Sequence, residues 1–235
     1  MTTFANGIFV EECKNRFLCL VKIKRETHLC YVASSARLSN FVDLVGKKVL
    51  LLENKGTNTR TKYTLYAVKS EYGYIALKLS LANTLLEDIM RKEYPRSISI
   101  QKEKSTPEGY KSDLLINSTP QVIVEAKSII TDKDSVTFPS VAGERSMKQF
   151  SALQDALRMG YRVRYCFVLL SPTIREMVID SSMEEFCIGL EKCIELGMLV
   201  EIYRLRNTNK LRFYLERDNE LEYSVLRKEV LFNAK

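Results

Sequence analysis

The sequence is poor in the residues from which several common sites are built. Its 235 residues contain one histidine, and its six cysteines include no CxxC pair. A Cys–His or Ser–His–Asp catalytic set would have to be built around His28, for which a structural or solvent role is expected. The composition therefore excludes a His-rich metal site, and the cysteines are expected to be reduced core thiols rather than disulfides or zinc ligands.

Long apolar runs and nucleotide-binding loops are also absent. No stretch approaches the roughly 18 apolar residues of a membrane span, and the N-terminus lacks a basic region followed by an apolar segment. Neither GxGxxG nor a P-loop occurs, which argues against a nucleotide cofactor. The chain is therefore expected to be cytoplasmic and to have no membrane partner.

What is present is the composition of an ordinary globular protein, with 46% hydrophobic and 28% charged residues. The length allows one large domain or two small ones. The 36 Lys and Arg residues exceed the 29 Asp and Glu residues, which leaves a formal net charge of +7. A basic excess of this size is compatible with a polyanionic partner but does not identify one.

The first third of the chain has the pattern of short strands. Apolar, β-branched and aromatic residues gather at 9–23, 47–52, 62–68 and 75–79, with a polar loop at 54–60. Several short strands within about 80 residues are typical of a small barrel or sandwich. We expect a β domain here.

The period of the pattern then changes. Apolar spacing predicts helices at 81–92, 142–159 and 182–196, and strands at 162–170 and 198–203. Two apolar runs, 113–116 and 121–126, flank a turn signal and predict a β-hairpin. Residues 101–111 and 131–139 are expected to be loops, and residues 204–235 are hard to place. This alternation indicates an α/β domain.

The hairpin carries the most informative polar residues. Asp113 opens its first strand, and Glu125 and Lys127 close the second. Because side chains alternate along a strand, Glu125 and Lys127 point to the same side. Two carboxylates at one strand end can hold a divalent cation, to which Ala126 can add a carbonyl oxygen. A lysine beside such a cation can polarise the attacking water or stabilise charge on phosphorus.

An Asp followed by ExK also occurs often by chance. The bland alternative is an edge-strand glutamate with a surface lysine, which form a weak exposed ion pair. The surroundings keep the nuclease pattern PD-(D/E)xK open beside this alternative. The preceding helix offers Glu87 as a further acidic residue, and the following helix offers Arg145, Lys148 and Gln149 within one turn to contact phosphate.

Several stretches in order along the chain resemble the sugar fermentation stimulation protein A family. They are TKYTL at 61–65, LANTLLE at 81–87, VIVEAKS at 122–128, FP at 138–139, and GER at 143–145 followed by Lys148. The sequence departs from the family at 33–38, where ASSARL stands in place of PNTGRL and only Arg37 and Leu38 remain. Single pieces are weak, but their order and spacing together are specific.

The resemblance implies an α/β (α+β) chain with two domains. The first is an N-terminal OB-like β-barrel over residues 1–80, and the second is a PD-(D/E)xK restriction-endonuclease-like α/β domain over residues 81–235. It also implies DNA binding, with nuclease activity inferred from the second domain. Asp113, Glu125 and Lys127 carry over as catalytic residues, with Glu87, Asp113 and Glu125 as ligands of Mg²⁺ or Mn²⁺.

Nucleic acid is thus the expected partner, with DNA favoured over RNA, and the oligomeric state is left open, a dimer included. OB-folds hold single strands in a basic groove with stacking aromatics. The residues expected to contact nucleic acid are basic and lie in both domains: Arg16, Arg37, Arg60, Lys62, Arg145 and Lys148.

Two rival functions remain beside the nuclease. A non-catalytic DNA-binding regulator of sugar-metabolism genes needs only the basic surface, and predicts salt-dependent binding that ignores divalent metal. A metabolic or structural protein without a nucleic-acid role predicts no such binding.

Overall fold

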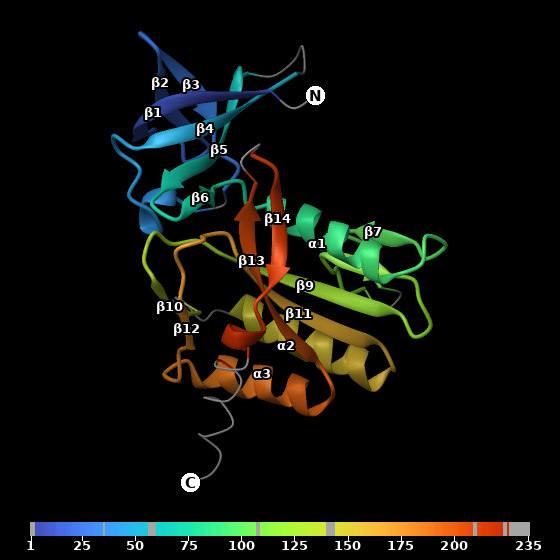
Figure 1. The fold of residues 1–235 in the computed structure, drawn as a ribbon. Coiled ribbons are helices and arrows are strands. Elements are labelled where there is room, and N and C mark those ends of the chain that lie inside the picture. The colour runs from blue at the N-terminus through green and yellow to red at the C-terminus, as the bar shows by residue number, and fades with distance from the viewer. Residues whose placement is uncertain are drawn as a thin grey trace.

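Two β structures follow one another along the chain, one above the other in Figure 1. The computed structural model describes residues 3–34, 36–55, 60–106, 109–139, 144–208, 211–222 and 225. The first structure is built from six strands: β1 (Phe4–Glu12), β2 (Leu18–Ile23), β3 (Glu26–Tyr31), β4 (Lys48–Glu53), β5 (Tyr63–Ser70) and β6 (Gly73–Ala76).

Five of these strands close into a barrel. β1 pairs with β2 and with β4, β2 pairs with β3, and β4 pairs with β5, all antiparallel. A parallel pairing of β3 with β5 closes the ring, and β6 adds to β5 outside it. The closing pairing joins Cys30 and Tyr31 of β3 to Tyr63 and Thr64 of β5. The expectation of an N-terminal OB-like barrel is confirmed.

The second structure is an α/β domain around a six-stranded mixed sheet. Its strand order is β14-β13-β11-β9-β8-β7. The elements are α1 (Leu81–Glu93), β7 (Ile100–Lys102), β8 (Leu114–Ile116), β9 (Val122–Ile129), β10 (Ser135–Phe138), α2 (Glu144–Arg158), β11 (Arg162–Leu169), β12 (Glu176–Ile179), α3 (Glu184–Glu195), β13 (Leu199–Asn207) and β14 (Phe213–Arg217).

The three central strands, β9, β11 and β13, are parallel, and α2 and α3 connect them. Both faces of these strands are covered, which explains why most of their residues are buried. Side chains alternate between the faces: Val124 points to the layer that contains α1, and Ile123 points to the layer that contains α2 and α3. Figure 1 shows α2 and α3 together on one side of the sheet.

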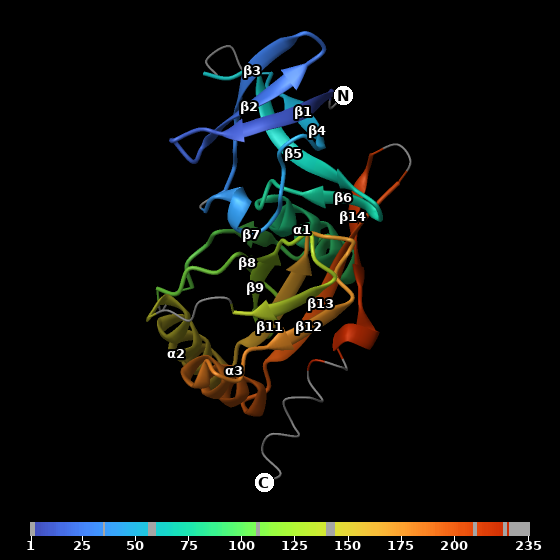
Figure 2. The same cartoon turned by 90° about the vertical axis from the view of Figure 1, so that its left-hand side faces the viewer.

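The barrel and the α/β domain share a hydrophobic core. One continuous cluster of buried residues runs from the barrel through α1 to one face of the sheet, and α1 lies between the two (Figure 2). The Tyr66 ring of β5 lies 5.4 Å from the Phe213 ring of β14. A boundary near residue 80 therefore separates two topologies, while the core continues across it.

Three segments differ from the expectations. Residues 101–111, expected to be a loop, begin with the last two residues of β7, which pairs antiparallel with β8. Residues 131–139, expected to be a loop, contain β10, which pairs in parallel with β12. The final segment, which the sequence left unplaced, contains the end of β13 and the antiparallel strand β14. β10 is only four residues long and its partner lies about forty residues away, so local periodicity carried no signal for it.

The cysteines behave as expected. All six are free thiols, and Cys19, Cys30, Cys166 and Cys193 are buried in the core. His28 lies on β3, with its ring edge-on to the Tyr63 ring at 5.6 Å. It packs within the barrel, far along the chain from the carboxylates of the hairpin.

Candidate active site at the β8–β9 hairpin

The β8–β9 pairing brings the expected carboxylates together. Leu114 is paired with Val124, so Asp113, the residue before β8, continues the same register opposite Glu125. Oδ2 of Asp113 accepts a hydrogen bond from the backbone N–H of Ala126 at 2.8 Å. This bond fixes Asp113 against β9, where the sequence expected it.

Lys127 completes the set. Glu125 and Lys127 share the face of β9 that Ile123 and Ile129 present to α2 and α3. The Lys127 Nζ lies 3.0 Å from Oε1 of Glu125. Glu125 is only 5% exposed, so this is not the exposed surface pair of the bland alternative.

Two further side chains hold Glu125 in place. The Tyr110 hydroxyl donates to Oε2 of Glu125 at 2.7 Å. The Gln149 amide of α2 donates to Oε1 of Glu125 and to the Tyr110 hydroxyl, and its oxygen accepts a hydrogen bond from Lys127. Helix α2 is thereby joined to β9 through one polar network, which restrains both the carboxylate and the ammonium group.

Asp113 has a comparable support from α1. The Asn83 amide donates to Oδ1 of Asp113 at 2.9 Å, while Ala126 donates to the other oxygen. Two donors on two oxygens orient the carboxylate toward the end of the hairpin. Asn83 thus connects the helix that packs under the barrel to the candidate site.

The electrostatics of the network follow from its burial. Burial raises the pKa of Glu125, and the negative charge of Asp113 adds to this effect, although the cation of Lys127 and the Tyr110 hydrogen bond oppose it. Burial and the neighbouring Glu125 also raise the pKa of Tyr110. Tyr110 therefore stays protonated and keeps donating its hydrogen bond.

A buried tyrosine lies under this network. Tyr165 of β11 is paired with Glu125 in the strand register, and the Lys127 Nζ lies 5.5 Å from the centre of its ring. Within the described part of the chain, its hydroxyl is the buried side-chain oxygen that has no hydrogen-bond partner. The Tyr165 ring supports the lysine from below, through a cation–π contact.

The raised pKa of Glu125 predicts a pH-dependent stability difference. When the pKa of a carboxyl is higher in the folded than in the unfolded chain, the free energy of unfolding of the protein falls as the pH rises above about 4.3, the pKa in the unfolded chain. A Glu125→Gln variant has no such loss. Its free energy of unfolding should match that of the wild type near pH 4 and exceed it at pH 8, as measured by urea denaturation.

Glu103→Gln is the matched control, because the Lys111 ion pair lowers the pKa of the exposed Glu103. Neutralising a carboxyl of lowered pKa removes stability at high pH, so the control has the opposite sign. A Glu125→Gln variant less stable than the wild type at pH 8 would show that the hydrogen bonds of Glu125 outweigh its burial.

Glu87 is not gathered with the other two carboxylates. Its Oε2 lies 2.6 Å from the Lys102 Nζ, and its Oε1 lies 3.0 Å from a guanidinium nitrogen of Arg91. These ion pairs outweigh partial burial and lower the pKa of Glu87. Among the described residues no three His, Cys, Asp or Glu side chains form a metal-binding group. Asn83, which lies one turn before Glu87 on α1, contacts Asp113 instead.

The basic residues expected in the barrel divide into two kinds. The Arg37 guanidinium donates to the backbone oxygens of Cys13 and Lys14 at 3.3 and 3.0 Å. It therefore ties the segment before a short 3₁₀ helix (Leu38–Asn40) to the β1–β2 loop. Arg16 and Lys62 are exposed, and each lies over the aromatic ring that follows it in sequence. Arg60 is exposed as well.

Helix α2 carries the remaining expected residues. Arg145 and Lys148 are exposed, and they precede Gln149 by four and by one residue on the same helix. Because Gln149 contacts Glu125, the first turns of α2 lie at the network. The contact of Arg145 and Lys148 with phosphate stays a prediction.

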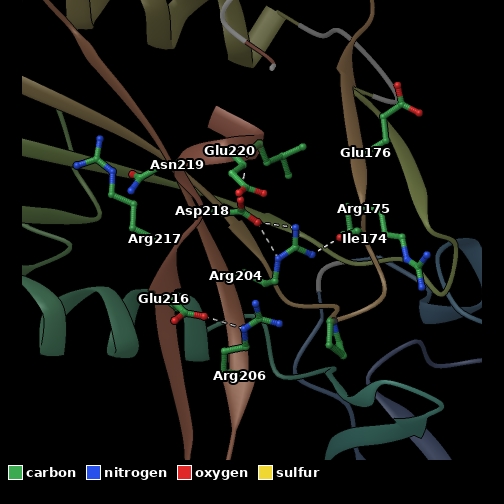
Figure 3. Close-up of a pocket in the computed structure, with 12 residues that line it drawn as sticks. Ile174, Arg175, Glu176, Arg204, Arg206, Glu216, Arg217, Asp218, Asn219 and Glu220 are labelled. Atoms are coloured by element: carbon green, nitrogen blue, oxygen red, sulfur yellow. Dashed lines mark hydrogen bonds and ion pairs between the residues drawn. The ribbon is translucent and has the colours of Figure 1, made fainter. Parts of the chain in front are cut away.

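A polar pocket of about 740 Å³ lies elsewhere, between β13, β14 and the segment before β12. Figure 3 shows Arg204 directed at Asp218 and at the Ile174 carbonyl, and Arg206 directed at Glu216. Arginines and carboxylates alternate around its wall. Their pairing fastens β14 to the sheet, and the pocket lies apart from the hairpin carboxylates.

Three supporting residues were missed from the sequence. Tyr110 lies in the stretch expected to be a loop, and its contact with Glu125 depends on how that loop folds. Asn83 had a weak signal, because it shares a polar helix face with Glu87. Tyr165 carried no signal, since it belongs to a buried apolar strand.

Comparison with known proteins identifies the chain's relatives. Residues 12–77 match the SfsA N-terminal OB domain, and residues 77–210 match the sugar fermentation stimulation protein RE domain. The sugar fermentation stimulation protein homolog of Natranaerobius thermophilus is 26% identical, over 86% of this chain and 88% of its own length. That of Ruminiclostridium cellulolyticum is 25% identical, over 82% and 86%.

The fold has a solved counterpart. The structure of Pyrococcus furiosus SfsA in complex with Ca²⁺ is similar with a TM-score of 0.73 and 19% identity, and the match covers 92% of this chain and 94% of that one. In the described part of the chain, no helix has the length and apolar character needed to span a membrane. The two matched domains cover most of the sequence, and the chain belongs to the sugar fermentation stimulation protein (SfsA) family.

Proposed function

We propose that this chain is a divalent-metal-dependent nuclease in which the barrel captures DNA and the α/β domain hydrolyses a phosphodiester bond. The observation that carries the proposal is that the β8–β9 pairing sets Asp113 opposite Glu125, beside the ion pair of Glu125 with Lys127. A structural ion pair needs no second carboxylate beside it. A metal-dependent hydrolytic site needs both the ion pair and the second carboxylate.

The donor set fits a hard cation. Asp113 and Glu125 supply carboxylate oxygens, and Ala126, the residue after Glu125, can add its carbonyl oxygen. This is the oxygen-only chemistry that Mg²⁺ and Mn²⁺ prefer. The Pyrococcus furiosus SfsA structure is a complex with Ca²⁺, a cation that takes the same kind of ligand. When bound, such a cation supplies Lewis-acid stabilisation of phosphate charge and a more acidic water.

The side chains have separate tasks in this proposal. The ammonium group of Lys127 lies where it can orient the attacking water and stabilise negative charge on the phosphate oxygens. Tyr110 and Gln149 keep Glu125 in one orientation. Asn83 does the same for Asp113. Preorganised donors of this kind cost no reorganisation when charge develops.

The testing experiment is cleavage of end-labelled single- and double-stranded DNA. The wild-type chain is incubated with Mg²⁺ or Mn²⁺, and with EDTA as the control. Cleavage that requires metal supports the proposal and identifies the preferred strand form.

A clear gel shift without cleavage, insensitive to divalent metal, would contradict hydrolysis. It would favour a non-catalytic DNA-binding regulator, a role to which the sugar-fermentation name of the family gives some support. If the chain neither shifts nor cleaves DNA, nucleic acid is excluded as its substrate.

A further inference from the structure

A row of lysines crosses the outside of the barrel, away from the basic residues that the sequence pointed to. Ile8 of β1 is paired with Lys22 of β2 on one side and with Lys48 of β4 on the other. All three side chains are exposed, and Ile8 is 38% exposed. Residues paired across neighbouring strands point to the same side of the sheet, so two ammonium groups flank one apolar side chain.

The row continues across two more strands. Val49 of β4 is paired with Val68 of β5, so the same register puts Lys48 opposite Lys69. Lys69 is in turn paired with Tyr74 of β6. We refer to Lys22, Lys48 and Lys69 as the lysine row; it crosses β2, β1, β4 and β5, which at about 4.8 Å per strand spans roughly 14 Å.

The row lines a shallow groove of about 680 Å³. Four of the nine residues around the groove are lysines, the fourth being Lys24 after the end of β2, and none is acidic. Gly7 also lines the groove. A side chain at this position would collide with the buried Val21 of β2 at 2.5 Å, so the strand needs glycine here. The groove is therefore positively charged, with an apolar centre.

No acidic partner neutralises these lysines. Among the described residues, Lys22, Lys24, Lys48 and Lys69 form no ion pair, in contrast to lysines in the α/β domain such as Lys102, which binds Glu87. Like charges opposed across strands destabilise a sheet. Folding alone gains nothing from this arrangement, whereas an anionic ligand would be attracted by it.

The overall charge is divided in the same way. Residues 1–80 contain 13 Lys and Arg against 6 Asp and Glu, while residues 81–235 contain 23 of each. The whole excess of +7 thus belongs to the barrel half. A polyanion should approach this half of the molecule first.

We propose that the lysine row is the main surface on which the barrel holds the sugar–phosphate backbone of DNA. This deepens the proposed function and rests on it. The row offers three ammonium groups along roughly 14 Å, which suits contact with the backbone phosphates of a short stretch of one strand. Exposed Ile8 and half-buried Tyr74 offer apolar surface to sugars or bases between the phosphate contacts.

The loop residues named from the sequence are less well placed for the main contact. The Arg37 guanidinium already binds two backbone carbonyls. Arg16 and Lys62 lie over their own neighbouring rings, on the loops at the other ends of the strands. They remain candidates for a smaller contribution.

The test compares two triple variants that remove the same charge from the same barrel. One replaces the row, with Lys22→Gln, Lys48→Gln and Lys69→Gln. The other replaces the loops, with Arg16→Gln, Arg60→Gln and Lys62→Gln. Binding of the full chain to a labelled single-stranded oligonucleotide is measured in EDTA, so that hydrolysis does not contribute, over a series of salt concentrations. Thermal unfolding checks that both variants fold.

The row variant should bind at least about 10-fold more weakly than the wild type at 0.1 M salt. The slope of the logarithm of its binding constant against the logarithm of the salt concentration should become shallower by about 2, at roughly 0.7 per lost phosphate contact. The loop variant should lose clearly less. Equal losses would mean that only net charge matters, and a larger loss in the loop variant would place the contact on the loops. Either result overturns the proposal.

Other polyanions are separate arms of the same experiment. If the row variant loses binding to vesicles rich in phosphatidylserine but keeps its affinity for DNA, the surface faces a membrane and the proposal is wrong. If the wild type binds no DNA at all, both the proposed function and the lysine-row proposal fail. If the wild type binds and cleaves DNA while the row variant is unchanged, only the lysine row is refuted.

Discussion

A Lys127→Met variant should cleave DNA at least about 100-fold more slowly than the wild-type chain at saturating Mg²⁺, while binding DNA with unchanged affinity. Loss of one positioned proton donor or charge-stabilising group typically costs a factor of 10²–10³ or more. Methionine keeps a stem of similar length over the Tyr165 ring, so the change removes the charge and retains most of the packing. Single-turnover cleavage of an end-labelled oligonucleotide measures the effect on chemistry directly.

Two controls separate catalysis from structure. Lys111→Met removes an ammonium group whose partner, Glu103, is exposed, and it should leave cleavage within about twofold because exposed ion pairs contribute little. Gel shifts in EDTA report on binding alone. If Lys127→Met cleaves as fast as the wild type, Lys127 is a structural counter-ion of Glu125, and the catalytic assignment of the hairpin is wrong.

The second large effect concerns stability. Arg164→Met should lower the free energy of unfolding by roughly 3–5 kcal/mol, because it removes the guanidinium group that binds both oxygens of a buried carboxylate. The Arg164 guanidinium donates to both oxygens of Glu201, at 2.7 and 3.0 Å, and to the Tyr203 hydroxyl at 3.1 Å. It also binds Glu93 at the end of α1. Glu201 is only 3% exposed, so water cannot replace the lost donors.

Matched variants decide whether the buried charge is the cause. Arg206→Met breaks an exposed ion pair with Glu216 on the same sheet and should cost at most about 1 kcal/mol. The double variant Arg164→Met, Glu201→Met should regain most of the loss, since replacing a whole buried pair by apolar residues is often nearly neutral. Urea denaturation at pH 7 measures all three. A single variant no less stable than the Arg206→Met control would show that Glu201 is held adequately by Arg217, which lies 3.1 Å away.

The candidate site could be predicted as far as strand geometry reaches. The turn signal at 117–120 correctly indicated a hairpin, and antiparallel pairing then sets Asp113 opposite Glu125. Alternation along β9 sets Lys127 on the same side. These are consequences of local pattern, which is why the three residues are together in the structure. Whether they hold a metal ion stays a prediction.

The contacts that hold the site depend on segments that meet only in three dimensions. Tyr110 reaches Glu125 because the loop before β8 folds back, and Gln149 reaches it because α2 packs on the face of the sheet to which Glu125 points. The same holds for Glu87, whose spacing on α1 suggested a third carboxylate. In the folded chain Lys102 of β7 meets it first and pairs with it.

The amino-acid pattern alone was sufficient for the two-part architecture, the helices and strands with clear periods, and the hairpin, because apolar periodicity and turn residues act over a few positions. Packing determined the rest. The short strand β10, the barrel closure through β3 and β5, the partner of Glu87 and the alignment of three lysines across the barrel each require residues distant in sequence to come together. Such contacts depend on the register and layering of the whole fold, which no local period encodes.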